Sequence, residues 1–189
     1  MSNYPVVGIV GMPGSGKTIL SQKFVDKGWN SVYFGSVTLN ELDKRKLEYN
    51  QQNEKSVREE LRSKYGIDAY AKILMPQIES LSKAAPLVLD GLYSWSEYKY
   101  LKSKLNDQLT IIAVVTNSEL RYSRLKNRIK RPLDLEEAVS RDYAEIENLE
   151  KGGPISIADY YIINNSNISE LLKQFEIIME NLKNHITLT

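Results

Sequence analysis

The feature that most constrains this chain is the eight-residue loop Gly11–Thr18, which reads GMPGSGKT. The apolar run Val6–Val10 precedes it and the helical stretch Ile19–Lys27 follows it, so the loop joins a buried strand to a helix. Glycines allow backbone angles that side chains forbid, and the loop N–H groups can therefore converge on phosphate oxygens. The positive end of the following helix favours the same anion. The order strand, loop, helix predicts a nucleotide-binding P-loop.

Five short β-rich runs are separated by helical stretches. They are continuous rather than alternating in polarity, which is typical of strands buried on both faces of a parallel sheet. The runs are Val6–Val10, Ser31–Phe34, Leu87–Leu89, Thr110–Val115 and Tyr160–Ile163. Near the C-terminus a stripe at helical spacing predicts core packing; it comprises Leu171, Leu172, Phe175, Ile178, Met179 and Leu182. We expect one doubly wound α/β domain.

The region from Thr38 to Lys83 has a helical pattern throughout and no strand. Both Thr38–Glu41 and Ser56–Glu59 fit a capping box, which predicts helix starts there. Gly66 suits a helix end, and Pro76 is expected to kink the next helix or end it early. An all-helical excursion between the second and third strands predicts an insertion that projects from the sheet, with Asn50–Lys55 as its exposed tip.

The composition excludes several classes of function. The chain has 25 Lys and Arg against 24 Asp and Glu, so no global field favours nucleic acid or an anionic membrane. It has no cysteine and a single histidine, His185, which excludes disulfides, thiolate chemistry, Cys-ligated zinc and histidine triads. No apolar run approaches the roughly 18 residues of a spanning helix, and the start lacks a signal-peptide layout. We expect a cytoplasmic protein with no membrane partner.

The loop and the third strand supply the first candidate site residues. Lys17 is expected to bridge the β- and γ-phosphates of ATP, and the Thr18 hydroxyl to ligate Mg²⁺. Asp90 follows the strand Leu87–Leu89, at the sheet edge where ligands sit in open α/β folds. It would support Mg²⁺ or accept the proton of an acceptor hydroxyl; alternatively it only caps the turn before Tyr93. The predicted ATP-binding residues of the loop are Gly11, Pro13, Gly14, Ser15, Gly16, Lys17 and Thr18.

A basic segment, Arg121–Arg131, carries six cationic residues and no acid. Arg121, Arg124 and Arg128 are three and four residues apart and share a helix face. Such cations stabilise the charge that spreads over a transferring phosphoryl group. A solvated face that pairs with the acids of Asp134–Glu150 and an RNA-binding patch are the alternatives. Arg141 is a further candidate phosphate contact, or a member of a helical ion pair.

Taken together, these segments resemble the adenylate-kinase-like superfamily of small P-loop kinases, and within it the dephospho-CoA kinases and a related uncharacterised archaeal group. The resemblance covers nearly the whole chain. It is carried by the segments Gly11–Thr18, Leu61–Gly66, Asp90-Gly91, Arg121–Arg128 and Ala158–Asn165, the last being similar to the Ala-Asp-x-x-Ile-x-Asn ending of dephospho-CoA kinases.

The resemblance implies five parallel strands in a single kinase domain, residues 1–189. Its core would comprise residues 1–35, 86–127 and 153–189, with an acceptor-binding helical region at about 36–85 and a mobile lid at about 128–152. By family position Arg124 would stack on adenine, and Asn164 and Asn165 would contact the base. Arg128 and Arg131 would be catalytic, and with Arg141 would close on the transferring phosphate.

The acceptor side departs from the family pattern. After the second strand the chain reads Gly35-Ser36-Val37, without the Gly-Asp and arginine of nucleoside monophosphate kinases. After Asp90-Gly91 it reads Leu92-Tyr93-Ser94, again without the usual arginine, and no residue matches the acidic base of dephospho-CoA kinases. The remaining candidate acceptor contacts are Arg58, Arg62, Lys64, Tyr65, Tyr93 and Arg141; the alternative for the helical ones is a plain surface role.

Three functions follow from these observations. The first is a kinase that uses ATP and Mg²⁺ to phosphorylate a nucleotide-like small molecule, such as dephospho-CoA, a nucleotide or a nucleoside. The second is an enzyme that phosphorylates RNA or DNA ends, against which the near-neutral charge argues. The third is a nucleotide-binding regulator without transfer activity. Both a monomer and a homodimer remain open.

Overall fold

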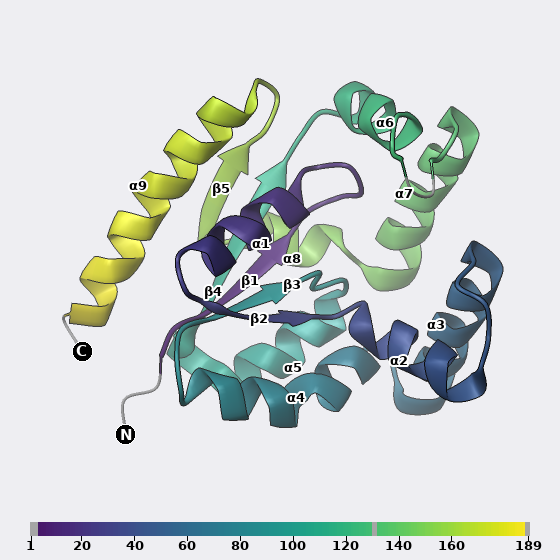
Figure 1. Cartoon of the computed structure of the whole chain (residues 1–189), viewed down its shortest axis with the longest axis horizontal. Helices are drawn as coiled ribbons and strands as arrows, with labels where there is room; N and C mark the ends of the chain where they lie inside the picture. The colour runs from purple at the N-terminus through teal and green to yellow at the C-terminus, as the bar shows by residue number, and fades with distance from the viewer. Residues whose placement is uncertain (1–3, 130–131, 188–189) are drawn as a thin grey trace.

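The computed structural model describes residues 4–129 and 132–187, with side chains described as far as residue 182. Its centre is a parallel sheet in the order β2-β3-β1-β4-β5 (Figure 1). The strands are β1 (Val6–Val10), β2 (Asn30–Tyr33), β3 (Leu87–Asp90), β4 (Leu109–Val115) and β5 (Tyr160–Ile163). Each predicted run is a strand, and the expected five-stranded parallel α/β fold is confirmed.

The helices alternate with the strands along most of the chain. They are α1 (Lys17–Asp26), α2 (Ser36–Arg45), α3 (Gln51–Tyr65), α4 (Ala69–Ser82), α5 (Trp95–Leu105), the 3₁₀ turn η1 (Asn106–Gln108), α6 (Ser118–Lys126), α7 (Leu135–Leu149), α8 (Gly152–Ser156) and α9 (Ile168–Thr187).

The sheet separates two hydrophobic cores because successive strand residues point to opposite faces. Val7, Ile9 and Val88 pack with α1 and α9 in one core. Val6, Leu87 and their same-face neighbours pack with α4 and α5 in the other. Helices therefore cover both faces, as a doubly wound sheet requires. The predicted stripe of α9 lies in the first core, with Phe175 fully buried and Leu172 partly buried.

The helical region after β2 divides into two parts. Figure 1 shows α2 and α3 beyond the carboxyl end of β2, where a projecting insertion was expected. The expectation is wrong for α4, because this helix packs directly against β2 and β3 and buries Tyr70 and Ile78. Apolar burial thus holds α4 against the sheet, and only α2 and α3 extend from it.

Three local expectations in this region are also wrong. Helix α2 begins at Ser36 rather than near Thr38. Helix α3 begins at Gln51 rather than at Ser56, because the Asn50 side chain caps it by accepting the Asn53 N–H at 2.9 Å. Most of Asn50–Lys55 is exposed, as expected of a tip, but it forms the start of this helix. Of the two effects expected of Pro76, the early end is wrong: α4 continues through Pro76 to Ser82, since packing on the sheet outweighs the lost hydrogen bond. Gly66 ends α3 as expected, at a φ of 96°.

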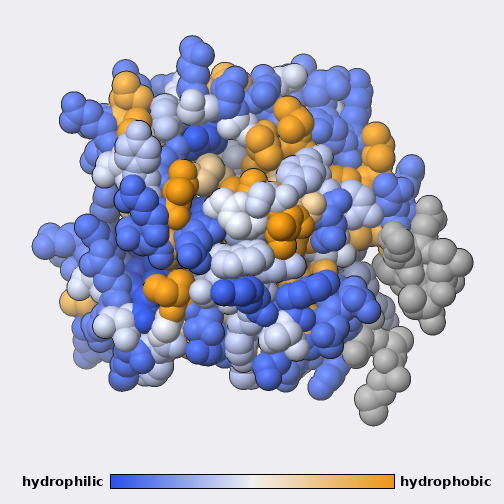
Figure 2. Space-filling view, turned by 180° about the vertical axis from the view of Figure 1, so that it is seen from behind, coloured by the Kyte–Doolittle hydropathy of each residue, from blue (hydrophilic) through white to orange (hydrophobic). Residues whose placement is uncertain are grey.

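The described residues form no membrane-spanning helix, and one face of the molecule (Figure 2) carries no large apolar patch. In the described part of the chain no helix is long and apolar enough to cross a bilayer. On the face in Figure 2, hydrophobic residues form small separate groups among hydrophilic ones. Isolated apolar residues of this kind are normal on soluble protein surfaces.

The N-terminus of α5 carries a buried carboxylate. Ser94 and Glu97 form a capping box in which Glu97 Oε2 accepts the N–H groups of Tyr93 and Ser94 at 2.8 and 3.0 Å. Glu97 is fully buried, and its Oε1 has no hydrogen-bond partner among the described residues. Burial is the main cause that raises the pKa of Glu97 from its ordinary 4.5 to about 7, against the opposing effects of these N–H groups and Arg62.

The raised pKa of Glu97 predicts a pH-dependent stability. Between pH 4.5 and about 7 the folded chain holds a proton on Glu97 that the unfolded chain releases, so the free energy of unfolding falls as pH rises through this window. Glu97→Gln keeps an acceptor for the cap but has no such proton. We expect the variant to gain about 2 to 3 kcal/mol relative to wild type between pH 5 and pH 8, measured by urea denaturation. A difference in unfolding free energy between Glu97→Gln and wild type that does not change with pH would contradict the raised pKa of Glu97.

Candidate active site

The P-loop adopts a backbone that only glycine accommodates at its centre. Gly14 has a φ of 78°, and a Cβ on it would lie 2.7 Å from the Arg121 carbonyl oxygen. Gly16 has a φ of 103° and is the N-cap of α1, where it supplies no side chain to cap the helix. The first N–H groups of α1 are thereby left without a side-chain cap, as anion sites at helix N-termini require.

Side chains from α6, β4 and β5 hold the loop from outside through its carbonyl groups. Asn164 donates from Nδ2 to the Ser15 carbonyl at 2.8 Å, and Thr116 donates to the same oxygen at 3.1 Å. Arg124 reaches the Gly14 carbonyl at 3.5 Å and the Asn164 carbonyl at 3.1 Å. The Ser15 hydroxyl is fully buried and has no partner among the described residues, so a phosphate oxygen would satisfy it. The loop therefore fits the phosphate chain of a nucleotide.

Lys17 folds back over the loop. Its Nζ donates to the carbonyl oxygens of Gly11 and Met12 at 2.8 and 3.1 Å. Removal of the amine from water is the main cause that lowers the pKa of Lys17 to about 7; the nearby Lys151 adds to this, while Glu145 and Asp90 oppose it. A phosphate group would restore the favourable environment of the ammonium form.

Asp90 lies at the carboxyl end of β3, on the strand beside β1. Burial raises the pKa of its carboxyl group, while the field of Lys17 and a hydrogen bond with Ser21 oppose this shift. The described residues contain no cluster of three acidic, His or Cys side chains that could hold a metal alone. Thr18 and Asp90 could still supply protein ligands to Mg²⁺, which ordinarily keeps waters and binds substrate phosphates for its other positions.

Arg121 of the basic segment attaches α6 to the P-loop and to α7. Arg121 is buried and donates to both carboxylate oxygens of Asp142 on α7, at 3.0 and 2.6 Å, and to the Pro13 carbonyl at 3.1 Å. The pairing with an acid of 134–150 was among the alternatives, but the pair is buried rather than solvated. Arg128 is exposed, and Arg131 lies outside the described residues.

Sequence reasoning missed a second buried ion pair at this edge. Glu145 on α7 accepts from Arg141 Nε at 3.1 Å and from Lys151 Nζ, and Lys151 is only 1% exposed. Burial alone would raise the pKa of Glu145, but Lys151, Arg141 and Lys17 together lower it to about 2. The Arg141 contact is the helical ion pair given as one of its two alternatives, with Glu145 four residues later as the partner. No sequence pattern indicates Lys151, which follows a left-handed turn at Glu150.

The other residues predicted to contact the acceptor or the base lie in different environments. Arg58 pairs with Glu54 at 3.4 Å on α3 and is partly exposed. The Arg62 guanidinium lies 5.1 Å from the Tyr70 ring centroid, and its Nε is buried without a partner among the described residues. Tyr93 lies under Lys151, whose Nζ is 5.1 Å from the ring centroid. Asn165 is exposed, and its Oδ1 accepts the Asn117 N–H at 2.9 Å.

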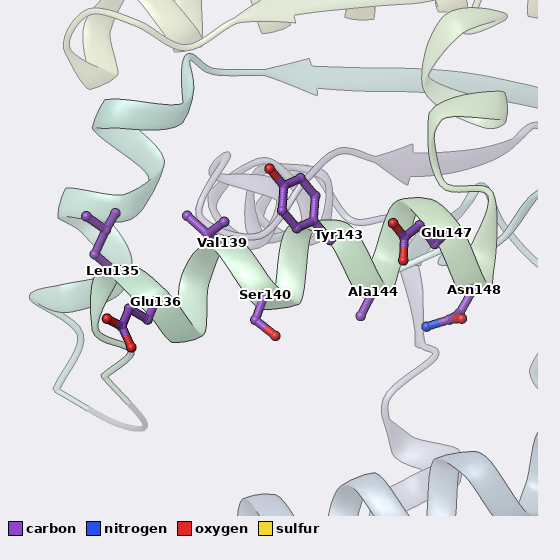
Figure 3. A pocket seen from close by; sticks show the side chains of 8 residues that line it. All are labelled: Leu135, Glu136, Val139, Ser140, Tyr143, Ala144, Glu147 and Asn148. Carbon is purple, nitrogen blue, oxygen red and sulfur yellow. The ribbon is translucent and has the colours of Figure 1, made fainter.

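A hollow of about 670 Å³ runs along one face of α7, away from these residues. Figure 3 shows that all the side chains lining it come from this one helix. None of the predicted site residues is among them, so the chemistry is assigned to the carboxyl edge of the sheet instead.

The Arg121–Asp142 pair generates a stability prediction. Asp142→Ala leaves the Arg121 guanidinium buried without its counter-charge, and we expect the free energy of unfolding to fall by about 3 to 5 kcal/mol. The measurement is equilibrium urea denaturation. The control is Asp26→Ala, which breaks the exposed 2.8 Å pair with Lys23 and is expected to cost less than about 1 kcal/mol. Equal losses of unfolding free energy in Asp142→Ala and Asp26→Ala would contradict this prediction.

Comparisons with known proteins identify the family of the chain. Residues 7–151 match a family described as an AAA domain. The UPF0200 protein of Thermococcus gammatolerans is 33% identical over 181 residues, which cover 94% of this chain and 95% of the relative. The UPF0200 protein of Sulfurisphaera tokodaii is 33% identical over 184 residues, which cover 96% of this chain and 99% of the relative.

Solved structures show the fold. A shikimate kinase from Acinetobacter baumannii, in complex with shikimate, is 16% identical with a TM-score of 0.61, over 95% of this chain and 96% of that one. A gluconokinase from Sinorhizobium meliloti 1021 is 14% identical with a TM-score of 0.56, over 97% and 98%. The resemblance to small P-loop kinases and to an archaeal group is thereby confirmed: the chain has the P-loop kinase-like fold and belongs to the UPF0200 family.

Proposed function

We propose that this protein is an ATP-dependent phosphotransferase that moves the γ-phosphoryl group to a small acceptor. One observation carries the proposal: Lys17, the first residue of α1, lies within the electrostatic influence of Asp90 and of the buried pair Glu145 and Lys151. Perturbed titratable groups gathered at one edge are typical of catalytic sites.

The contacts of the P-loop support the proposed ATP-binding roles of the residues around it. Arg124 lies between the loop and the end of β5, and we assign its guanidinium to the face of the base. The Asn164 side chain is already bound to Ser15 and serves to shape the loop. Of the two predicted asparagines, the exposed Asn165 is therefore the one proposed to contact the base.

The chemistry at the transferring group is divided among three residues. Lys17 neutralises the phosphate charge that develops during transfer. Thr18 and Asp90 would hold a Mg²⁺ ion, which would supply further neutralisation of phosphate charge. Asp90 supports that ion or takes the proton of the attacking hydroxyl, and both roles need the ionised carboxylate.

We place the acceptor between the carboxyl edge of the sheet and the helices α2 and α3. Arg62 is the strongest candidate contact, because its Nε lacks a partner among the described residues and its guanidinium is already oriented by Tyr70. Arg58, Tyr93 and Arg141 are further proposed contacts. Arg128 and Arg131, in the proposed lid, would close on the phosphate. The acceptor is thus a small molecule with an anionic group, and a nucleotide-like compound remains our first candidate.

An acceptor screen tests the function. Purified protein with ATP and Mg²⁺ is incubated with dephospho-CoA, nucleoside monophosphates, nucleosides, shikimate, gluconate and short RNA ends, and products are identified by mass spectrometry. We expect one acceptor to gain a phosphoryl group. Lys17→Ala should lower this transfer by at least about a hundredfold, because it removes a charge from the transition state, while circular dichroism remains unchanged.

The matched control is Lys173→Ala, which removes an exposed lysine on α9 paired with Glu170 at 2.7 Å. It should leave transfer unchanged. Full activity in Lys17→Ala would contradict the proposal. ATP binding without transfer to any acceptor would instead favour the regulator.

Asp90→Asn tests the second catalytic group. The amide keeps the shape of the side chain but neither accepts a proton nor carries the charge that supports Mg²⁺, so we expect turnover to fall by about a hundredfold or more. Steady-state kinetics with the identified acceptor measure the loss. Turnover within about twofold of wild type would assign Asp90 only to the turn before Tyr93.

A further inference from the structure

We propose that Lys151 is a catalytic residue that contacts the γ-phosphoryl group, and that Glu145 holds it in position. The proposal rests on the function proposed above and adds a cation that neither the loop motif nor the basic segment contains. Lys151 is buried, its amine is bonded to Glu145, and α7 and α8 supply the pair from opposite sides of a turn.

Geometry places the Lys151 amine at the carboxyl edge of β3. Its Nζ lies 5.1 Å from the centroid of the Tyr93 ring. The Tyr93 hydroxyl in turn lies 2.9 Å from where a Cβ on Gly91 would stand. Gly91 directly follows Asp90, whose strand pairs with the strand that leads into the P-loop. The aromatic ring thus supports the ammonium group on the side of the site where the phosphoryl group would be transferred.

Lys151 is fixed to the core of the domain. It precedes α8, where Gly153 packs so closely on Trp95 that a Cβ would lie 2.9 Å from that ring. Ile155, in the same helix, packs against the core on the α4 and α5 side of the sheet. Glu145, in contrast, belongs to α7. Both residues belong to the proposed lid, and the ion pair joins α7 to the end of the lid that leads into α8.

The charges around Glu145 leave positive potential for an anion. This carboxylate is surrounded by Lys151, Arg141 and Lys17, and their combined field lowers its pKa to about 2. The carboxylates of Glu145 and Asp90 offset two of the three cations; the third formal positive charge remains, although Arg141 is exposed to solvent. A phosphoryl group offers oxygen atoms to all three. The alternative is that the Lys151–Glu145 ion pair only stabilises the packing of α7 near α8 and makes no contact with a nucleotide.

Nucleotide binding separates these two roles. We would measure by titration calorimetry the affinity of Lys151→Met for the non-hydrolysable ATP analogue AMP-PNP and for ADP, both with Mg²⁺. A lysine that contacts only the γ-phosphoryl group should leave ADP affinity within about threefold of wild type. It should weaken AMP-PNP affinity by about ten- to a hundredfold, the range of a charge-assisted hydrogen bond. Lys151→Arg should recover part of this loss.

An equal loss of affinity for AMP-PNP and ADP, or no loss for either, would overturn the proposal. Lys151 and Glu145 would then have only a structural role. If Lys151→Met does not fold, Lys151→Met with Glu145→Gln removes both buried charges, and the same difference between nucleotides is expected. This measurement of nucleotide affinity requires no phosphoryl acceptor. A chain that transfers no phosphate but still shows the selective loss would therefore refute the proposed transfer, while the Lys151 contact with the γ-phosphate would stand.

Discussion

The buried guanidinium of Arg121 is the interaction on which the arrangement of the site depends. It donates to the Pro13 carbonyl of the P-loop, to the Thr116 carbonyl after β4 and to the Asp142 carboxylate on α7. A planar fork of donors suits this task, because one side chain can hold three chain segments at fixed angles. Its neutralisation by a single carboxylate also explains how a full charge is retained at 6% exposure.

Helix α7 is consequently attached at two points to the part of the chain that holds the nucleotide. Asp142 binds Arg121 near the loop, and one turn later Glu145 binds Lys151 near β3. Both acids lie on the buried face of the helix, whereas Leu135 and Tyr143 lie on the exposed face. Movement of α7 away from the P-loop would separate both buried ion pairs, which is energetically costly.

Much of the donor side was predictable from the sequence. The strand runs, the P-loop, the apolar stripe of α9 and the place of Asp90 all follow from local patterns, because backbone conformation and side-chain period are encoded within a few residues. The expected helix start at Ser56 was wrong because local patterns can offer more than one cap. Asn50 offered an equally good cap earlier in the chain, and only the packing of α3 distinguishes the two.

The sequence by itself determined a P-loop in a parallel α/β domain, since a phosphate cradle needs glycines in a fixed order between a strand and a helix. Only the tertiary structure decided which charges meet there. Lys151 and Glu145 are brought to Lys17 by the turn at Glu150 and by the packing of α8 on Trp95, and Asn164 reaches Ser15 across 149 positions of the chain. Electrostatic interactions act through space, so residues without a shared motif acquire a common function only when the chain has folded.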